Sequence, residues 1–195
     1  KRKKKKMELN NAVRKNDLAA VRERISAGDD ANWEDKNWDN ATALHEACIN
    51  GYKQIAILLM SLNSNKIDLN KQNNNDSTPF YLACQQGHTE VVNAMMNNDR
   101  VDVNKAANDG TKPLYFTCVK GHTEVVKMLI NHAKVDTTLS WTDTNWSPLL
   151  VAAFMGHDDV IKLLLSSHRR INFYQKSICS TKKGLTAINI AKESQ

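Results

Sequence analysis

The sequence contains no long apolar run and none of the short motifs that commonly carry catalysis. No stretch approaches roughly eighteen uninterrupted apolar residues, which argues against a transmembrane helix. The basic residues at the amino end are not followed by an apolar segment, so we expect no secretory signal peptide. A glycine-rich phosphate loop, a Gly-x-Ser-x-Gly elbow and a Cys-x-x-Cys pair are also missing. We therefore expect no enzyme activity, no cofactor and no small-molecule substrate.

Outside its first six residues, the chain has no excess of charge of either sign. These six residues are all basic: Lys1, Arg2, Lys3, Lys4, Lys5 and Lys6. They supply six of the 27 Lys and Arg residues, and the remaining 21 equal the 21 Asp and Glu residues. The net charge of +6 therefore belongs to this basic run, and the charge of the rest does not support a nucleic-acid-binding surface. We predict that residues 1–7 form a disordered basic tail, because consecutive cations repel one another.

The main feature that the sequence does contain is an internal repeat. The segment from Pro113 to Val126 largely repeats the segment from Pro79 to Val92, thirty-four residues earlier. A landmark position between two apolar stretches holds asparagine in the first copy and glycine in the next four: Asn16, Gly51, Gly87, Gly121 and Gly156. Repeats of about this length predict a solenoid, in which each unit buries its apolar face only against its neighbours.

Each repeat has the local signals of two short helices. A proline at the first helical position lacks only an amide hydrogen that has no partner there, so Pro79, Pro113 and Pro148 each predict a helix start. The landmark residue suits a left-handed cap that ends this helix. A second helix follows with apolar residues at helical spacing, as in residues 125–130, and polar turns such as residues 108–110 separate the repeats.

A related tetrapeptide begins nine residues before each landmark glycine. Its four copies are Thr42-Ala43-Leu44-His45, Thr78-Pro79-Phe80-Tyr81, Lys112-Pro113-Leu114-Tyr115 and Ser147-Pro148-Leu149-Leu150. Together with the Gly-His step and the Val-Val pair that recur in register, it resembles the Thr-Pro-Leu-His motif of the ankyrin-repeat family. The resemblance covers about Glu8 to Lys192. It implies an all-α repeat solenoid of ankyrin-type helix-turn-helix units with β-turn fingers.

The repeats divide the region after the tail into five units and a partial sixth. This region spans residues 8–195, with units at about 8–39, 40–75, 76–109, 110–144, 145–183 and 184–195. Asn32, Asn70 and Asn104 stand where the family has Asn after the second helix. The sequence departs from the family pattern after Asp136, where threonines replace that Asn, and after Ser166, where a longer loop delays the partial sixth unit.

Cysteine is scarce, and Cys48, Cys84 and Cys118 share one register position. Equivalent atoms in stacked repeats lie roughly 8–10 Å apart, whereas a disulfide needs Cα atoms about 4.4–6.8 Å apart. We therefore predict that these cysteines are small core residues with free thiols. This usage agrees with a reducing compartment, and we expect an intracellular protein, cytoplasmic or nuclear.

The histidines also follow the repeat register. His88, His122 and His157 each follow a landmark glycine, which favours a structural role at the start of the second helix. The resemblance implies that His45 makes hydrogen bonds that tie a turn to a helix. Because a metal ion needs several ligands around one point, histidines spread along a solenoid argue against a metal site.

The expected partner-binding face carries several large apolar side chains. The resemblance implies that partners bind at the finger tips and at the exposed end of the first helix, which line a concave face. The sequence places five such residues there, where the core needs no apolar side chain: Trp38, Trp141, Trp146, Phe154 and Met155. Aromatic residues and Met are enriched in interface centres, so we predict that they form a partner-binding patch. The alternative is that the tryptophans brace long fingers against neighbouring loops, with Phe154 packed beneath them.

The sequence thus predicts a non-catalytic protein-protein interaction module, or scaffold, that binds another protein through its concave finger and first-helix face. A second possibility is an electrostatic adaptor, in which the basic run from Lys1 to Lys6 binds nucleic acid or an acidic protein tail. Binding through the tail weakens steeply with added salt, whereas binding through a tryptophan patch changes little. A third possibility is a regulatory segment of a larger protein.

Overall fold

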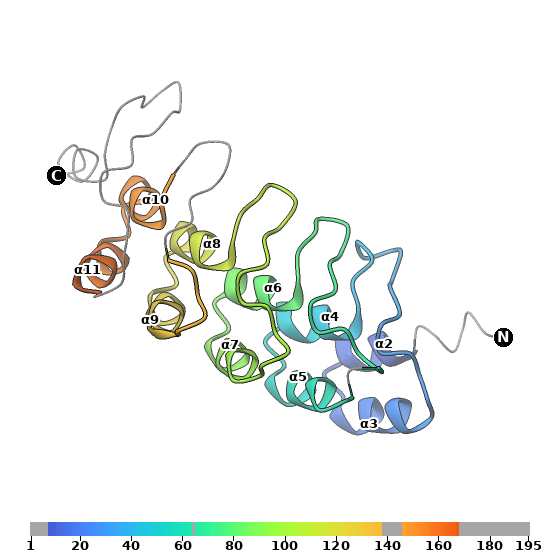
Figure 1. Ribbon diagram of the computed structural model, residues 1–195. Helices are drawn as coiled ribbons and strands as arrows, with labels where there is room; N and C mark the ends of the chain where they lie inside the picture. The colour runs from blue at the N-terminus through green and yellow to red at the C-terminus, as the bar shows by residue number, and fades with distance from the viewer. Residues whose placement is uncertain (1–7, 64, 138–145, 168–195) are drawn as a thin grey trace. The chain divides into compact units, whose positions relative to one another are not determined.

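The computed structural model describes residues 8–63, 65–137 and 146–167. These residues form ten α-helices and no β-strand. In chain order the helices are α2 (Glu8–Arg14), α3 (Leu18–Ser26), α4 (Ala43–Ile49), α5 (Lys53–Met60), α6 (Pro79–Gln86), α7 (Thr89–Met96), α8 (Pro113–Lys120), α9 (Thr123–Asn131), α10 (Pro148–Met155) and α11 (Asp158–Ser166). Each sequence repeat supplies one pair of short helices, and a long finger loop precedes each first helix from α4 to α8 (Figure 1).

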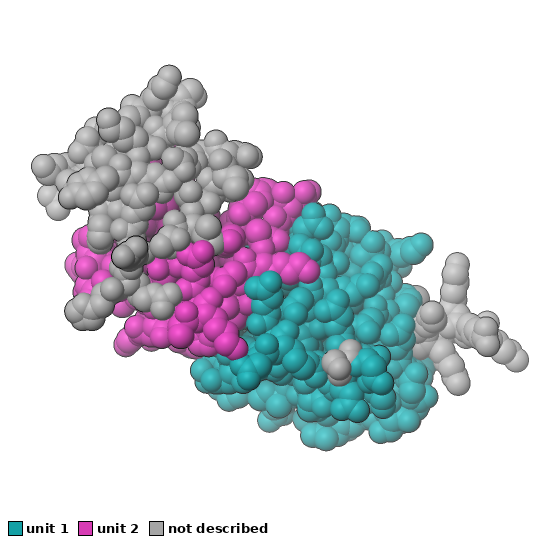
Figure 2. Space-filling model, viewed as in Figure 1, with its two compact units in different colours: residues 1–102 teal, residues 103–195 magenta. Residues whose placement is uncertain are grey.

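The chain divides into two compact units, residues 1–102 and residues 103–195 (Figure 2). In the first unit α2, α4 and α6 pack side by side as one layer, and α3, α5 and α7 form a second layer (Figure 1). In the second unit α8 packs on α10 and α9 packs on α11, so the two layers recur. Core residues such as Leu44, Leu59 and Leu149 are buried. This arrangement is the all-α repeat solenoid that the sequence predicts.

The first helices begin and end where the local sequence signals place them. The helices α6, α8 and α10 start at proline. Thr78 caps α6, because its Oγ1 accepts a hydrogen bond from the Tyr81 amide at 3.1 Å. The three helices end at Gly87, Gly121 and Gly156, whose φ values of 74°, 72° and 74° lie in the left-handed region. Glycine adopts this conformation without the steric cost of a Cβ atom, so the predicted caps are confirmed.

Asparagine side chains tie the loop of one repeat to the loop of the next. Asn70 donates from Nδ2 to the Arg100 carbonyl and accepts at Oδ1 from the Asp102 amide, both at 2.7 Å. The same two bonds link Asn32 to Lys66 and Asp68, and Asn104 to Lys134 and Asp136. Each asparagine therefore pairs with one carbonyl and one amide of the following loop.

Histidine side chains form a second link between repeats. His88 donates from Nε2 to the Ile49 carbonyl at 2.9 Å, and His157 donates to the Val119 carbonyl at 2.9 Å. The structural role predicted for histidines after a landmark glycine is confirmed for these two. The His157 ring lies against Gly121, where an added Cβ atom would stand 2.6 Å from Nδ1. Both the backbone conformation and the neighbouring ring therefore require glycine at this position.

His45 is buried at the start of α4 and joins its own turn to the next repeat. Its Nδ1 accepts a hydrogen bond from the Thr42 amide, and its Nε2 donates to the Ser77 carbonyl, both at 3.1 Å. Burial lowers the pKa of His45 to about 4, because the charged imidazole would lose its hydration. The equivalent residue of the first repeat is Asn10, whose Nδ2 donates to the Ala41 carbonyl at 3.3 Å. The hydrogen-bonding role that the resemblance implies for His45 is confirmed.

The three cysteines that share a register position are buried free thiols: Cys48, Cys84 and Cys118. Burial raises the pKa of Cys48 and of Cys118, because a thiolate would lose its hydration in the core. These residues act as small apolar side chains, as the sequence predicts. Cys179 lies outside the described residues.

We expect Gly121→Ala to lower the free energy of unfolding more than Gly156→Ala does. Both substitutions place alanine in a left-handed conformation, which costs about 1–2 kcal/mol. Only the first drives the new Cβ atom against the His157 ring, because nothing lies within 4 Å of the corresponding position at Gly156. Urea unfolding should give a difference above about 1 kcal/mol. Equal losses would mean that the His157 ring moves aside without cost.

Stability should fall as the pH is lowered from 6.5 to about 4, in part because of His45. Above this range the imidazole is neutral in both states, and within it the unfolded chain binds a proton that the folded chain excludes. Near pH 4, the part of the free energy of unfolding that is lost through His45 is on the order of 3 kcal/mol. His45→Asn, which copies the arrangement at Asn10, should remove this part of the pH dependence in urea unfolding. An identical pH profile for the variant would contradict the assignment.

Candidate partner-binding surface

The last turn of each first helix leaves two neighbouring side chains partly or fully exposed. They stand one and two residues before the landmark position and, within each unit and together with the preceding finger, form a surface that we call the first-helix face of that unit. In the first unit these residues are Arg14, Lys15, Ile49, Asn50, Gln85 and Gln86, and in the second they are Val119, Lys120, Phe154 and Met155. Because the core does not use these positions, their side chains are available for recognition.

The finger before α4 presents Trp38 to solvent. This side chain is 58% exposed, more than any other large apolar side chain in the described ranges. The Trp38 amide donates to the Asp35 carbonyl at 2.9 Å, and the Ala41 amide donates to the Trp38 carbonyl at 2.8 Å. Asp39 and Asn40 follow with φ values of 50° and 55°, which are unusual for residues other than glycine. A strained and hydrogen-bonded turn therefore fixes the position of the tryptophan.

Arg14, the last residue of α2, supports this finger from the preceding repeat. Its guanidinium carbon lies 4.7 Å from the centroid of the Trp38 ring. Its Nη2 atom lies 2.8 Å from Asp35 Oδ2 and 2.7 Å from Glu46 Oε1. Burial alone would lower the pKa of Arg14, but hydrogen bonds to Glu46 and Asp35 outweigh burial and raise it. Both carboxylates are buried, so their ion pairs hold the Arg14 guanidinium in place. The guanidinium in turn limits the movement of the Trp38 ring.

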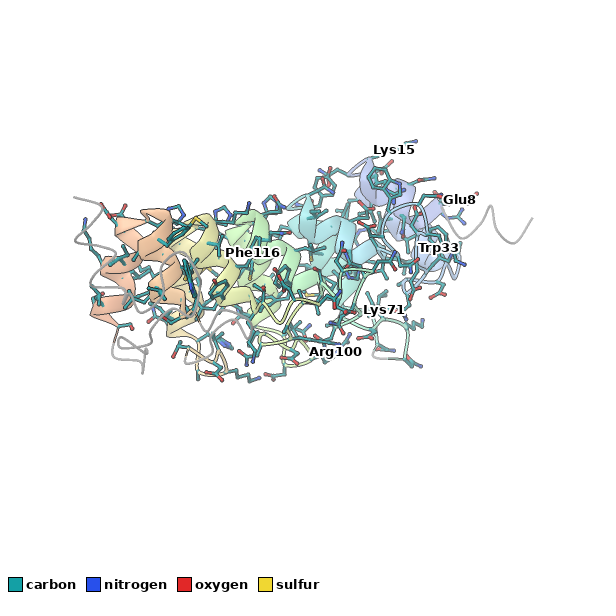
Figure 3. All side chains as sticks on the ribbon, turned by 90° about the horizontal axis from the view of Figure 1, so that it is seen from above. Glu8, Lys15, Trp33, Lys71, Arg100 and Phe116 are labelled. Carbon is teal, nitrogen blue, oxygen red and sulfur yellow. The ribbon has the colours of Figure 1, made fainter. Side chains whose placement is uncertain are left out.

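Hydrogen bonds and an ion pair also join the fingers of the second and third repeats. The Asn74 amide donates to the Asp39 carbonyl at 2.7 Å, and Asn40 Nδ2 donates to Asn74 Oδ1 at 2.6 Å. Farther from the tips, Lys71 pairs with Glu34 at 2.7 Å. Figure 3 shows Lys71 among the loops of the first unit. The turn that carries Trp38 is thus supported from both neighbouring repeats.

In the second unit Trp146 supports Phe154. Trp146 is 8% exposed, whereas Phe154 and Met155 are 43% and 46% exposed. The rings of Trp146 and Phe154 meet edge to face with their centroids 4.8 Å apart. Burial of Trp146 fits the alternative in which a tryptophan braces its finger, although Phe154 is the more exposed of the two rings. Phe154 and Met155 belong to the first-helix face by their register positions, and both side chains are exposed.

Helix α8 adds an aromatic residue that the sequence analysis did not select. Phe116 is half-buried on α8, and Lys120 Nζ lies 5.6 Å from the centroid of its ring (Figure 3). Phe116 stands three residues before Val119 and therefore lies on the same side of the helix. The repeat register could have indicated that Phe116 lies on this face. Phe116 stands five residues before its landmark glycine, as Glu46 does, and Glu46 belongs to the cluster around Arg14.

Comparison with known proteins agrees with this architecture. The family pattern described as "Ankyrin repeats (3 copies)" matches residues 9–107 and 99–177. The chain belongs to the ankyrin-repeat family. Ankyrin repeats are generally protein-interaction modules and are typically non-catalytic.

One solved structure and one curated protein sequence are similar to this ankyrin-repeat chain. The crystal structure of EF0377, an ankyrin repeat protein, is 25% identical, with a TM-score of 0.82 over 97% of this chain and 92% of that chain. The SMC5-SMC6 complex localization factor protein 1 of Homo sapiens is 40% identical over 65 residues. That match covers 33% of this chain and 6% of the relative, so the chain spans only a small part of the relative's length.

Some predicted site residues of this ankyrin-repeat chain lie outside the described ranges, namely Trp141 and the basic run from Lys1 to Lys6. Trp38 belongs to the first unit and Phe154 to the second, so each is described within its own unit. The shared partner-binding role of the five patch residues stays a prediction.

Other kinds of site find no support among the described residues. No group of three or more His, Cys, Asp or Glu side chains in these ranges is arranged to hold a metal ion. Within the same ranges, no helix combines the length and the apolar character needed to cross a membrane.

We expect Trp146→Ala and Trp38→Ala to differ sharply in stability. Removal of the buried Trp146 ring leaves a cavity beside Phe154 and should lower the free energy of unfolding by about 3–5 kcal/mol. Removal of the exposed Trp38 ring loses mainly its contact with Arg14, worth about 0.5–1 kcal/mol. Urea unfolding measures both values. A loss of less than about 1 kcal/mol for Trp146→Ala would show that this tryptophan does not brace the fold.

Proposed function

We propose that this ankyrin-repeat chain is a non-catalytic module that binds another protein on its first-helix face. The observation that carries the proposal is the exposure of Trp38 against the Arg14 cluster and of Phe154 against the Trp146 ring, with Met155 exposed beside Phe154 in the chain. Large aromatic side chains of this kind supply most of the binding energy in many interfaces. A prepared surface also loses little conformational freedom when a partner binds.

The support beneath each exposed side chain favours recognition over simple packing. If Trp38 only filled a gap in the finger, its ring would be buried rather than 58% exposed. Instead the cluster of Arg14, Asp35 and Glu46 covers part of the ring and leaves the rest accessible. Phe154 likewise rests on Trp146 and keeps 43% of its surface exposed. We infer that these positions are arranged for contact with a partner.

The similar human protein is named as a localization factor for the SMC5-SMC6 complex. That name supports a protein as the partner of this chain and gives no further detail about it. The buried free thiols of Cys48, Cys84 and Cys118 support an intracellular location, cytoplasmic or nuclear, which we also propose.

Photo-crosslinking tests which face of the chain meets the partner. Benzoylphenylalanine in place of Trp38 or Met155 should crosslink a discrete polypeptide in an extract of the source cell, because both positions lie on the first-helix face. The same group in place of Ile57 or Leu165, which are 44% and 52% exposed on second helices, should not do so. Mass spectrometry then identifies the crosslinked polypeptide.

Three controls separate this proposal from binding through the basic tail. Excess unmodified chain should abolish the crosslink, and removal of residues 1–6 or added salt should leave it nearly unchanged. Equal crosslinking from all four positions would contradict a first-helix face. Loss of the crosslink with the tail would instead indicate the electrostatic adaptor.

A further inference from the structure

The first-helix face of the second unit combines apolar side chains from two adjacent helices. Helix α8 contributes Phe116 and Val119, which are half-buried, and α10 contributes Phe154 and Met155, which are exposed. The two helices pack against each other. We call these four residues the apolar strip.

The helix ends that carry the apolar strip are held together by a hydrogen bond. His157, two residues after Met155, donates from Nε2 to the Val119 carbonyl at 2.9 Å. Trp146 packs edge to face on Phe154 and limits the movement of its ring. The strip is therefore prepared before any partner arrives, which reduces the entropy lost on binding.

Positive charge lies on the α8 side of the apolar strip. Lys112 precedes α8 and Lys120 ends it, and Lys120 Nζ stands 5.6 Å from the Phe116 ring. The acidic residues Asp158 and Asp159 lie on the opposite side, at the start of α11, where Lys162 pairs with Asp159. The neighbouring charged residues of the second unit also include Lys105 and Asp109 in the loop before α8 and the exposed Glu124 at the start of α9, so the lysines at positions 105, 112 and 120 outnumber these two acidic residues. The α8 side therefore favours a negatively charged partner.

We propose that the first-helix face of the second unit binds an acidic peptide segment that carries apolar anchor residues. The anchors contact Phe154, Met155 and Val119, and the carboxylates of the segment pair with Lys112 and Lys120. This inference rests on the proposed function and specifies the partner's chemistry. The basic run of a second copy of this chain is a poor occupant, because its charge has the same sign as that of the lysines.

Selection from a random dodecapeptide library displayed on phage tests the inference without a known partner. The full-length chain is immobilised, and bound phage are counter-selected against Met155→Asp. We expect enriched peptides to combine aspartate or glutamate with aromatic or branched aliphatic residues. The most enriched peptide is then synthesised, and its affinity is measured by fluorescence anisotropy.

Charge-reversal variants give the decisive comparison. Lys120→Glu should weaken the selected acidic peptide about tenfold or more, and a peptide with lysine in place of its acidic residues should regain affinity for that variant. The matched control Lys127→Glu, on the exposed side of α9, should bind as the original chain does. Met155→Ala should weaken binding about fivefold or more, whereas Leu165→Ala on α11 should not. Circular dichroism confirms that each variant is folded.

The outcomes separate this inference from the proposed function. Enrichment of neutral or basic peptides that still require Met155 would overturn the acidic specificity and keep the first-helix face as a binding surface. No enrichment, or enrichment that is indifferent to every first-helix substitution, would overturn both. Equal effects of Lys120→Glu and Lys127→Glu would show that general charge alone attracts the peptide, and would overturn the specific pairing with Lys120.

Discussion

Hydrogen bonds from the side chains of one repeat to the backbone of its neighbour determine where the other parts of each unit lie. Asn70 satisfies a carbonyl and an amide of the next loop, and His88 reaches back to the carbonyl of Ile49. Buried or crowded backbone groups without partners are costly, so the repeats stack in one register. Apolar packing between the two helix layers provides the main stabilisation, but these polar contacts decide how neighbouring repeats align.

Because packing and alignment depend on other residues, the side chains of the first-helix face can differ from one repeat to the next. Its side chains make neither the asparagine nor the histidine contacts, because Ile49 and Val119 accept the histidine hydrogen bonds through their backbone carbonyls, and these side chains lie outside the core. At one register position, two residues before the landmark, the five repeats carry Arg14, Ile49, Gln85, Val119 and Phe154. The two units therefore share a scaffold and differ in their surfaces. The first unit exposes Trp38 beside the ion pairs of Arg14, and the second unit exposes the apolar strip beside Lys112 and Lys120.

Local chemistry explains why much of the fold can be predicted from the sequence. Proline at a helix start and glycine in a left-handed cap act within a few residues, and the register carries each signal to the next copy. Side-chain exposure was harder to predict. Trp146 precedes a helix cap, and its register equivalents Ser77 and Thr111 are buried whereas Ala41 is half-buried, so exposure at this position follows from the packing of each repeat and not from the residue type. The support of Trp38 by Arg14 joins residues of different repeats, and no repeated motif marks it.

The contact between Gly121 and the His157 ring makes two residues in different repeats depend on each other. Gly51 and His88 form the same pair in the first unit, whereas the first landmark is Asn16, and Tyr52 stands at the register position of the histidines. A substitution at one landmark glycine therefore acts on the histidine of the following repeat, so that a change within one repeat disturbs the contact between two repeats.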